Sequence, residues 1–206
     1  MPTTAVEELN IILAGVGGQG VILMSDLLGN SALADGLNIQ GSEVLGMAQR
    51  GGSVFSNIRL GDGAVGPLTP QGKCDILVAV EPSEALRYVK ELAPSALVIL
   101  NTTEVRPYTV ATGESAYPAF DVILATVRKV TKQIIPLDAT QIAKEAGNAL
   151  AANTAMLGAL FGSGRLPIKV ETMKELIKSR VPPKAVEANL KAFDMGYAAV
   201  AESLNA

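Results

Sequence analysis

Histidine is absent from this chain of 206 residues, and cysteine occurs once, as Cys74. The missing histidine removes the commonest general base and metal ligand of proteins. A single cysteine excludes a disulfide within the chain, and it excludes an iron–sulfur cluster held by four cysteines of this chain alone. Any metal or electron-transfer chemistry that involves this chain must therefore come from a partner.

Positive charge, aromatic residues and long apolar runs are also scarce. The formal net charge is −3, aromatic residues make up 4% of the chain, and tryptophan is absent. Without a basic block interleaved with aromatic residues, the sequence predicts no nucleic-acid binding. The apolar runs fall well short of the ~20 residues that span a bilayer, and no signal-like segment opens the chain. We therefore expect no membrane contact and a cytoplasmic location.

Small and aliphatic residues are abundant. Hydrophobic residues make up 49% of the sequence and charged residues 18%, which is ample for one packed core. Short apolar runs typical of buried strands alternate with longer runs typical of helices. We predict a single domain over residues 1–206 with an α/β fold of three layers. It has a mostly parallel, Rossmann-like sheet, helices on both faces and a helical C-terminus.

The individual elements are placed by apolar runs and by start and stop signals. Strands are expected at Leu9–Ala14, Asn38–Glu43, Ser53–Leu60, Asp75–Val80, Ala96–Asn101 and Ile134–Leu137. Helices are expected at 20–35, 82–91, from Ala139 onward, and at Ala149–Phe161, Val170–Ser179 and Pro183–Leu204. Pro82 suits the first turn of its helix, and Asp138 suits the cap of the next one. The polar, turn-rich segment 102–120 predicts no element.

The first predicted strand leads directly into a glycine-rich loop and then a helix. The N–H groups at a helix start are unpaired and lie at the positive end of its dipole, so they suit a phosphate or another anion. A tight turn without a ligand needs only one or two glycines. We therefore predict ligand or cofactor contact, with a purely architectural turn as the alternative. The residues concerned are Gly15, Gly17, Gly18, Gln19 and Gly20.

The spacing of Gly15, Gly17 and Gly20 also fits the dinucleotide-binding pattern G-x-G-x-x-G. An NAD site of this kind needs an acidic residue about 20 positions further on, at the end of the second strand. Glu43 is near that place, but it enters another glycine-rich segment. A self-sufficient NAD-dependent dehydrogenase is the alternative function, and without histidine its acid–base residue would be a lysine or a tyrosine.

The second glycine-rich segment carries an arginine. Arg50 stands beside Gly51 and Gly52, and this combination of a fixed cation with exposed backbone suits a phosphate or a carboxylate. Such loops gather at the carboxyl ends of the strands, so we predict that these three residues form the second half of the site. The alternative is a surface loop whose arginine is solvated or paired with an acid.

Two further patterns have simpler explanations. Gly61-Asp-Gly63 is similar to the start of the thiamine-diphosphate motif, but the paired asparagines that end that motif are missing, so we predict a turn. Asn153 lies in an alanine-rich predicted helix and is expected to be a buried hydrogen-bonding group. Gly158 of the same helix is expected to allow close helix packing. No catalytic residue and no metal ligand is predicted.

In their order along the chain, these segments resemble the gamma subunit, or gamma domain, of the 2-oxoacid:ferredoxin oxidoreductases. The resemblance rests on Gly15–Gly20, Gly41-Ser-Glu43, Met47-Ala-Gln-Arg-Gly-Gly52, Gly147-Asn148, Asn153 with Met156-Leu-Gly158, and Asn189 with Ala192-Phe193 and Gly196-Tyr197. Within the family, the second and third of these stretches most resemble the small (beta) subunit of the indolepyruvate enzymes.

The resemblance implies a role in oxidative decarboxylation of a 2-oxoacid, such as indolepyruvate, to an acyl-CoA with reduction of ferredoxin. It implies that coenzyme A is associated with this chain, whereas thiamine diphosphate, Mg²⁺ and iron–sulfur clusters sit on partner subunits. Those thiamine-binding and iron–sulfur subunits are the expected partners, with ferredoxin contacted indirectly. The chain alone is then expected to be inactive. Gly17–Gly20 and Arg50–Gly52 are expected to meet CoA or the partner.

Overall fold

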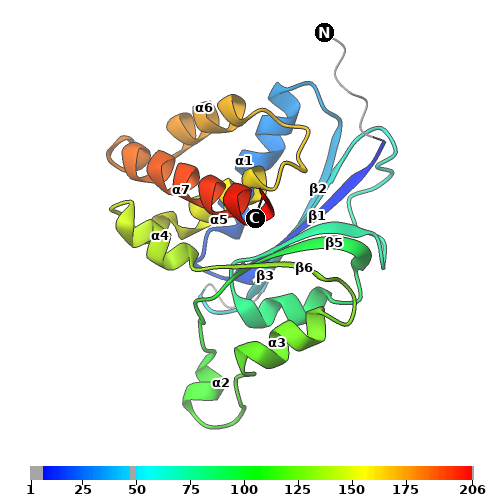
Figure 1. Cartoon of the computed structure of the whole chain (residues 1–206), viewed down its shortest axis with the longest axis vertical. Helices are drawn as coiled ribbons and strands as arrows, with labels where there is room; N and C mark the ends of the chain where they lie inside the picture. The colour runs from blue at the N-terminus through cyan, green and yellow to red at the C-terminus, as the bar shows by residue number, and fades with distance from the viewer. Residues whose placement is uncertain (1–6, 47–49, 206) are drawn as a thin grey trace.

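A six-stranded mixed sheet forms the middle layer of the molecule (Figure 1). The computed structural model describes residues 7–46 and 50–205. The strands are β1 (Leu9–Val16), β2 (Ile39–Leu45), β3 (Ser53–Leu60), β4 (Cys74–Ala79), β5 (Leu92–Asn101) and β6 (Gln133–Leu137). Their spatial order is β2-β3-β1-β4-β5-β6. Strands β1, β4, β5 and β6 pair in parallel, and β3 runs antiparallel to both of its neighbours. The predicted mostly parallel sheet is confirmed, with one reversed strand.

Helices cover both faces of this sheet, as predicted. One face carries α1 (Val21–Ala34), α4 (Ala139–Glu145), α5 (Ala152–Gly162), α6 (Val170–Arg180) and α7 (Val186–Asn205). The other face carries the 3₁₀ helix η1 (Pro82–Tyr88) and α3 (Phe120–Val127). Short elements complete the chain: α2 (Tyr108–Ala111), η2 (Ala149–Ala151) and η3 (Pro183–Ala185).

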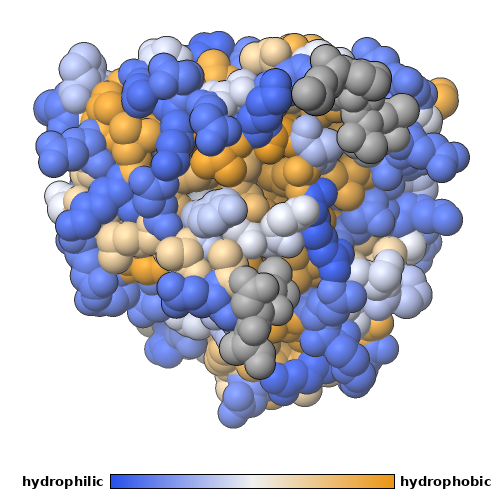
Figure 2. All heavy atoms as spheres, turned by 45° about the horizontal axis from the view of Figure 1, so that its top comes forward, coloured by the Kyte–Doolittle hydropathy of each residue, from blue (hydrophilic) through white to orange (hydrophobic). Residues whose placement is uncertain are grey.

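The two cores follow from the alternation of side chains along buried strands. In β1, Ile11 and Leu13 pack toward the α1–α5 side, whereas Ile12 and Ala14 pack toward the η1–α3 side. Successive side chains of a strand point to opposite faces, so a strand covered on both faces must be apolar throughout. This is why the continuous apolar run of β1 predicts a central strand. Figure 2 shows one outer face, where patches of hydrophobic residues lie among hydrophilic ones.

Three expectations about local structure are wrong. The helix predicted over 82–91 is a 3₁₀ helix that ends at Tyr88, because the carbonyls of Lys90 and Glu91 accept hydrogen bonds from the N–H groups of Gly72 and Cys74. Helix α3 escaped prediction, since its β-branched sequence carries no side-chain cap. The segment 102–120, to which no element was assigned from the sequence, contains the short helix α2. The remaining predicted strands and helices are confirmed within a few residues.

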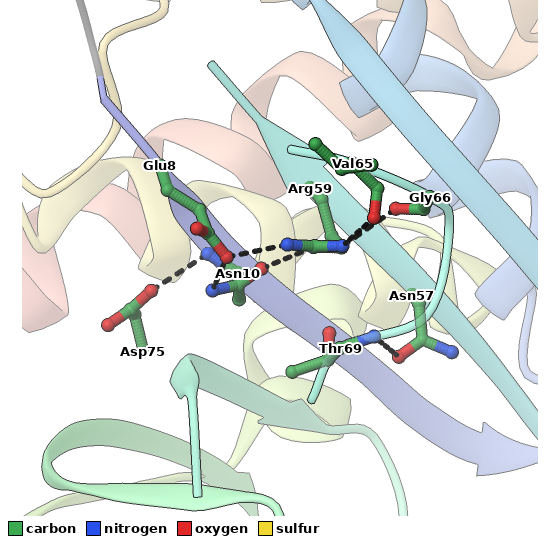
Figure 3. Close-up of polar contacts among 8 residues, drawn as sticks. All are labelled: Glu8, Asn10, Asn57, Arg59, Val65, Gly66, Thr69 and Asp75. Atoms are coloured by element: carbon green, nitrogen blue, oxygen red, sulfur yellow. Dashed lines mark hydrogen bonds and ion pairs between the residues drawn. The ribbon is translucent and has the colours of Figure 1, made fainter. Parts of the chain in front are cut away.

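A buried arginine holds the amino-terminal end of the sheet together (Figure 3). Arg59 of β3 is 4% exposed. Its guanidinium donates to Glu8 Oε1 at 2.6 Å, to Asn10 Oδ1 at 2.7 Å, and to the carbonyls of Val65 and Gly66 at 3.0 and 2.8 Å. One side chain thus ties β1 to the loop between β3 and β4, at the end of the strands opposite to the glycine loops.

This network predicts an acid-sensitive contribution to stability. Hydrogen bonds from Asn10 and then Arg59 lower the pKa of the Glu8 carboxyl below its ordinary value of 4.5. A carboxyl whose pKa is depressed by folding stabilises the protein above its unfolded-state pKa and loses this contribution as the pH falls through the folded-state pKa. We expect urea unfolding between pH 6 and pH 3 to show a shallower acid loss of stability in Glu8→Gln than in the parent. Parallel profiles for the two proteins would contradict this.

Two further features bear on chemistry. Cys74 is completely buried, and burial raises the pKa of its thiol to about 12, so the thiolate that reacts or binds metal is suppressed. None of the helices within residues 7–46 and 50–205 is long and apolar enough to cross a membrane.

Candidate functional site

The candidate site lies at the carboxyl ends of two parallel neighbours, β1 and β4. Strand β1 leads into α1 on one face of the sheet, whereas β4 leads into η1 on the other face. The chain therefore leaves the sheet in opposite directions at this point and opens a crevice between the two strands. In open α/β sheets, ligands bind in such a crevice.

The structure brings the two predicted glycine-rich loops together beside this crevice. The Gly17 N–H donates to the Gly52 carbonyl at 2.8 Å, and the Gly51 N–H donates to the Gly17 carbonyl at 3.1 Å. The two loops therefore lie side by side, and their role as two halves of one binding site stays a prediction. Met47, Ala48 and Gln49, which contribute to the family resemblance, lie outside the described residues.

Backbone conformation and close side-chain contacts account for three of the four glycines, Gly15, Gly18 and Gly20. A Cβ on Gly15 would lie 2.8 Å from Val21 Cγ2, and one on Gly20 would lie 2.3 Å from Asn153 Nδ2. Gly18 and Gly20 have φ angles of 99° and 78°, which side chains disfavour. Two glycines thus supply the positive φ angles of the turn, in agreement with the premise that such a turn needs one or two. Evidence for a ligand must come from the space around the loop.

Gln19 locks the loop to the neighbouring strand. Its Oε1 accepts a hydrogen bond from the Val16 N–H at 2.9 Å, and its Nε2 donates to the Val80 carbonyl at 3.3 Å. The same carbonyl accepts from Asn101 Nδ2 at 2.9 Å. Asn101 Oδ1 in turn accepts from the Ala139 N–H at the start of α4. Side-chain amides thus fix the carboxyl ends of β1, β4 and β5 relative to one another.

These ends enclose a cavity of about 230 Å³, which we call the switch cavity. Its wall combines the glycine loop, the ends of β4 and β5, and the residues around the starts of α4 and α5. No charged side chain lines it within the described part of the chain. The lining residues are Gly18, Gln19, Val80, Asn101, Thr103, Val105, Thr140, Ala149, Leu150, Ala152 and Asn153.

Two long helices point their N-termini at this cavity. Helix α1 begins after Gly20 without a side-chain cap. Helix α5 continues η2, whose Asn148 cap accepts from the Leu150 N–H, and the Thr154 N–H in the first turn of α5 donates to Asn153 Oδ1. The positive ends of both helix dipoles therefore face the same space, and at the start of α1 the N–H groups have no side-chain acceptor. This arrangement favours an anion, as the glycine loop alone predicts.

Asn153 supplies an unpaired donor to the same space. Only 6% of the Asn153 surface is exposed. Its Oδ1 accepts from the Thr154 N–H at 2.8 Å, and this bond fixes which end of the amide is oxygen. The Nδ2 group lies against Gly20 on the cavity side, without an acceptor among the described residues. This atom is not among the buried unpaired polar atoms of the described residues, so it is open to the cavity and can donate to a ligand there.

A second buried group, Glu81, orders the chain beside the cavity. Its carboxylate is fully buried and accepts hydrogen bonds from Ser83 Oγ at 2.6 Å, the Val105 N–H at 3.3 Å and the Tyr117 hydroxyl. Burial, and then the hydrogen bond to Glu81, raise the pKa of Tyr117, so this hydroxyl stays a donor. The polar segment left unassigned from the sequence is thus anchored to the end of β4, with Val105 in the cavity wall.

Sequence reasoning found only part of this wall. Gly18 and Gln19 line the cavity, but Arg50 does not, and its exposed guanidinium forms no hydrogen bond or ion pair with the described residues. Asn153 was expected to be a buried hydrogen-bonding group, which is confirmed, and it also faces the cavity. Asn101 was missed, although it ends a predicted strand, where cavity residues of α/β folds are expected.

The arrangement does not match a dinucleotide site. Strand β3 lies between β1 and β2, so Glu43 on β2 is two strands away from the glycine loop. In the dinucleotide fold the acidic residue ends the strand next to β1. The turn predicted at Gly61-Asp-Gly63 is confirmed. In residues 7–46 and 50–205, no cluster of acidic or cysteine side chains could hold a metal ion.

Comparison with known proteins gives a consistent match. Residues 10–199 match the family model of pyruvate ferredoxin/flavodoxin oxidoreductase. The indolepyruvate oxidoreductase subunit IorB of Archaeoglobus fulgidus is 46% identical over 92% of this chain and 94% of its own length.

Solved structures agree with the sequence match. The gamma subunit of a keto/oxoacid ferredoxin oxidoreductase from Geobacter sulfurreducens superposes with a TM-score of 0.68 and 25% identity, over 96% of this chain and 99% of its own. The 2-oxoglutarate:ferredoxin oxidoreductase of Magnetococcus marinus, solved with 2-oxoglutarate, coenzyme A and succinyl-CoA bound, shares the fold. Its TM-score is 0.71 at 21% identity, over 95% of this chain and 31% of that longer chain.

Proposed function

Since this chain belongs to the pyruvate ferredoxin/flavodoxin oxidoreductase family, as a gamma-type subunit of a 2-oxoacid:ferredoxin oxidoreductase, we propose that it binds coenzyme A at the switch cavity. In this role residues 1–206 act as one gamma domain. The reaction of such a complex is the oxidative decarboxylation of a 2-oxoacid to an acyl-CoA with reduction of ferredoxin. Indolepyruvate is the proposed 2-oxoacid, because the similar subunit of Archaeoglobus fulgidus carries that substrate in its name.

The unpaired Asn153 amide carries the proposal. Coenzyme A is anionic at neutral pH, and its phosphate oxygens are acceptors. The switch cavity offers them the Asn153 Nδ2 donor and the start of α1, which has no side-chain cap, with no acidic side chain in its described wall. Arg50, Gly51 and Gly52 are proposed to lie at the mouth, where Arg50 is free to meet the ligand or a partner subunit. The other glycine-loop residues, Gly15, Gly17 and Gly20, are proposed to shape the site.

The chain's own part in the reaction is binding rather than bond breaking. It has no histidine, and its only cysteine is buried with a raised pKa. Coenzyme A supplies the thiol that takes up the acyl group. Thiamine diphosphate, Mg²⁺ and iron–sulfur clusters are proposed to sit on the thiamine-binding and iron–sulfur partner subunits, through which electrons reach ferredoxin.

Replacing Asn153 with aspartate tests this proposal in the purified complex. The change keeps the size of the side chain and the acceptor for the Thr154 N–H, but it turns the Nδ2 donor into an anionic oxygen. We expect calorimetric titration with coenzyme A to show at least about tenfold weaker binding, the equivalent of roughly 1.4 kcal/mol. In turnover, the KM for coenzyme A should rise more than kcat falls.

Asn148→Asp is the matched control. Asn148 caps η2 by accepting from the Leu150 N–H, and aspartate caps equally well. This residue does not line the cavity, so binding should change little. Unchanged affinity in Asn153→Asp would contradict the proposed site. Saturable micromolar binding of NADH would instead support the dehydrogenase alternative.

A further inference from the structure

A second hollow lies away from the switch cavity, between α1 and the edge strand β2, which Figure 1 shows next to each other. We call it the α1–β2 groove. It encloses about 530 Å³ and opens to solvent. Its wall includes Asp26, Gly29 and Leu33 of α1 and Ile39, Gly41 and Glu43 of β2.

Two glycines keep this groove open. Neither Gly29 nor Gly41 has a positive φ angle. A Cβ on Gly41 would make an ordinary contact of 3.6 Å with the Asn57 carbonyl, and one on Gly29 would lie 3.3 Å from the flexible Ile39 Cδ1. The fold therefore requires glycine at neither position, although glycine inside a helix or strand is destabilising relative to alanine. The empty volume above them is maintained at a cost in stability.

The strand that borders the groove is an unprotected sheet edge. Among the described residues, strand β2 pairs with β3 alone. It contains no lysine or proline, and it exposes Val44 and Leu45 at 44% and 66%. The opposite edge strand, β6, is shorter and contains Pro136, which lacks a backbone N–H donor. Free edges pair readily with other chains, so proteins normally block them. One edge of this sheet is thus protected by a proline, whereas no described strand pairs with the outer side of β2.

The groove is acidic. Asp26 and Glu43 line it, and no basic side chain does within the described residues. The negative charge of Asp26 is partly compensated by a hydrogen bond from Asn30 Nδ2 at 2.9 Å and by the Arg180 guanidinium at 3.7 Å. Glu43 forms no hydrogen bond or ion pair with the described residues. A second copy of this chain, with the same acidic groove and a net charge of −3, is electrostatically a poor occupant. A basic segment is complementary.

We propose that an extended segment of a partner subunit pairs with the free edge of β2. This segment places a lysine or arginine side chain in the α1–β2 groove, over Gly29 and Gly41 and toward Glu43. Backbone pairing supplies affinity, and the single cationic side chain supplies specificity, as in other strand-addition interfaces. The inference rests on the proposed membership of a multi-subunit complex, but not on where coenzyme A binds.

A substitution that fills the groove distinguishes a role in partner binding from a role in the stability of the isolated chain. Gly41→Val adds a strand-favouring side chain that projects into the empty volume. We expect the melting temperature of the isolated variant to be equal to or above that of the parent. Its association with the purified partner subunits, measured by sedimentation, should be weakened at least about tenfold. Glu43→Gln should also weaken association and should flatten its dependence on salt.

Gln40→Val is the matched control, because residue 40 lies on the same strand but on the opposite face. It should assemble like the parent. Hydrogen exchange of the β2 amides should slow on assembly of the parent and of Gln40→Val, and much less in Gly41→Val.

Three results would overturn the proposal. Normal assembly of Gly41→Val would show that no side chain of the partner occupies the groove. A doubled mass of the isolated parent chain that Gly41→Val abolishes would assign the groove to a second copy. Failure of the parent chain to associate with any oxidoreductase subunit would overturn both this inference and the proposed complex, whereas loss of coenzyme A binding in Asn153→Asp leaves the groove unaffected.

Discussion

Replacing Gly196 with alanine is expected to destabilise the protein by about 3 kcal/mol or more, which is the upper range for overpacking a core. A Cβ at this position in α7 would lie 2.0 Å from the Ala155 carbonyl oxygen of α5. The obstacle is backbone rather than a flexible side chain, so the two helices would have to move apart. Native stability totals only about 5–15 kcal/mol, so much of the protein should be unfolded under mild denaturant.

The close approach of α5 and α7 makes this effect large. Gly158 and Gly162 of α5 meet the carbonyls of Phe193 and Tyr197 in the same way, with Cβ positions only 2.0 and 2.3 Å from those oxygens. Nearly all of α5 is buried, so neither helix can shift toward solvent without opening the core. The expectation that Gly158 allows close helix packing is thus confirmed.

Urea unfolding followed by circular dichroism measures this loss. Gly29→Ala is the matched control, since it is also a glycine-to-alanine change inside a helix. Its Cβ would meet only the end of the Ile39 side chain at 3.3 Å. We expect Gly29→Ala to be neutral or stabilising by up to about 1 kcal/mol through helix propensity. Equal destabilisation by both substitutions would refute the role of backbone contact.

Replacing Arg59 with methionine is expected to cost about 3–5 kcal/mol, as when one partner of a buried ion pair is removed. Methionine fills much of the same volume but donates no hydrogen bond. The Glu8 carboxylate, the Asn10 amide oxygen and the carbonyls of Val65 and Gly66 would all lose their donor. Because Glu8 is 34% exposed, water can compensate in part, so the lower half of this range is expected.

An exposed arginine provides the control for this effect. Arg106 pairs with Glu104 at 2.9 Å but is 65% exposed. Arg106→Met should cost no more than about 1 kcal/mol, because a surface ion pair gains little over hydration. Free energies of unfolding from urea titration at pH 7 compare the two variants. Similar losses of unfolding free energy in the two variants would mean that burial of the Arg59 network does not contribute to stability.

Local patterns account for most of the fold. The apolar run of β1, the proline in the first turn of η1 and the Asp138 cap of α4 act within a few residues, so the sequence predicts them without knowledge of distant contacts. The sequence missed α3 and the early end of η1. Helix α3 lacks a local cap, and η1 ends where the carbonyls of Lys90 and Glu91 join the start of β4. Long-range contacts override local propensity in such places.

Sequence and tertiary structure each account for a part of the candidate site. The sequence by itself determined that the chain has no catalytic histidine, that a glycine loop opens a long helix, and that its segments resemble the gamma subunits. Only the tertiary structure decided that Gly20 meets Asn153, more than a hundred residues away, and that β3 separates Glu43 from the glycine loop. Side-chain types and short spacings are written in the chain, whereas strand order depends on how distant segments bury their apolar faces together.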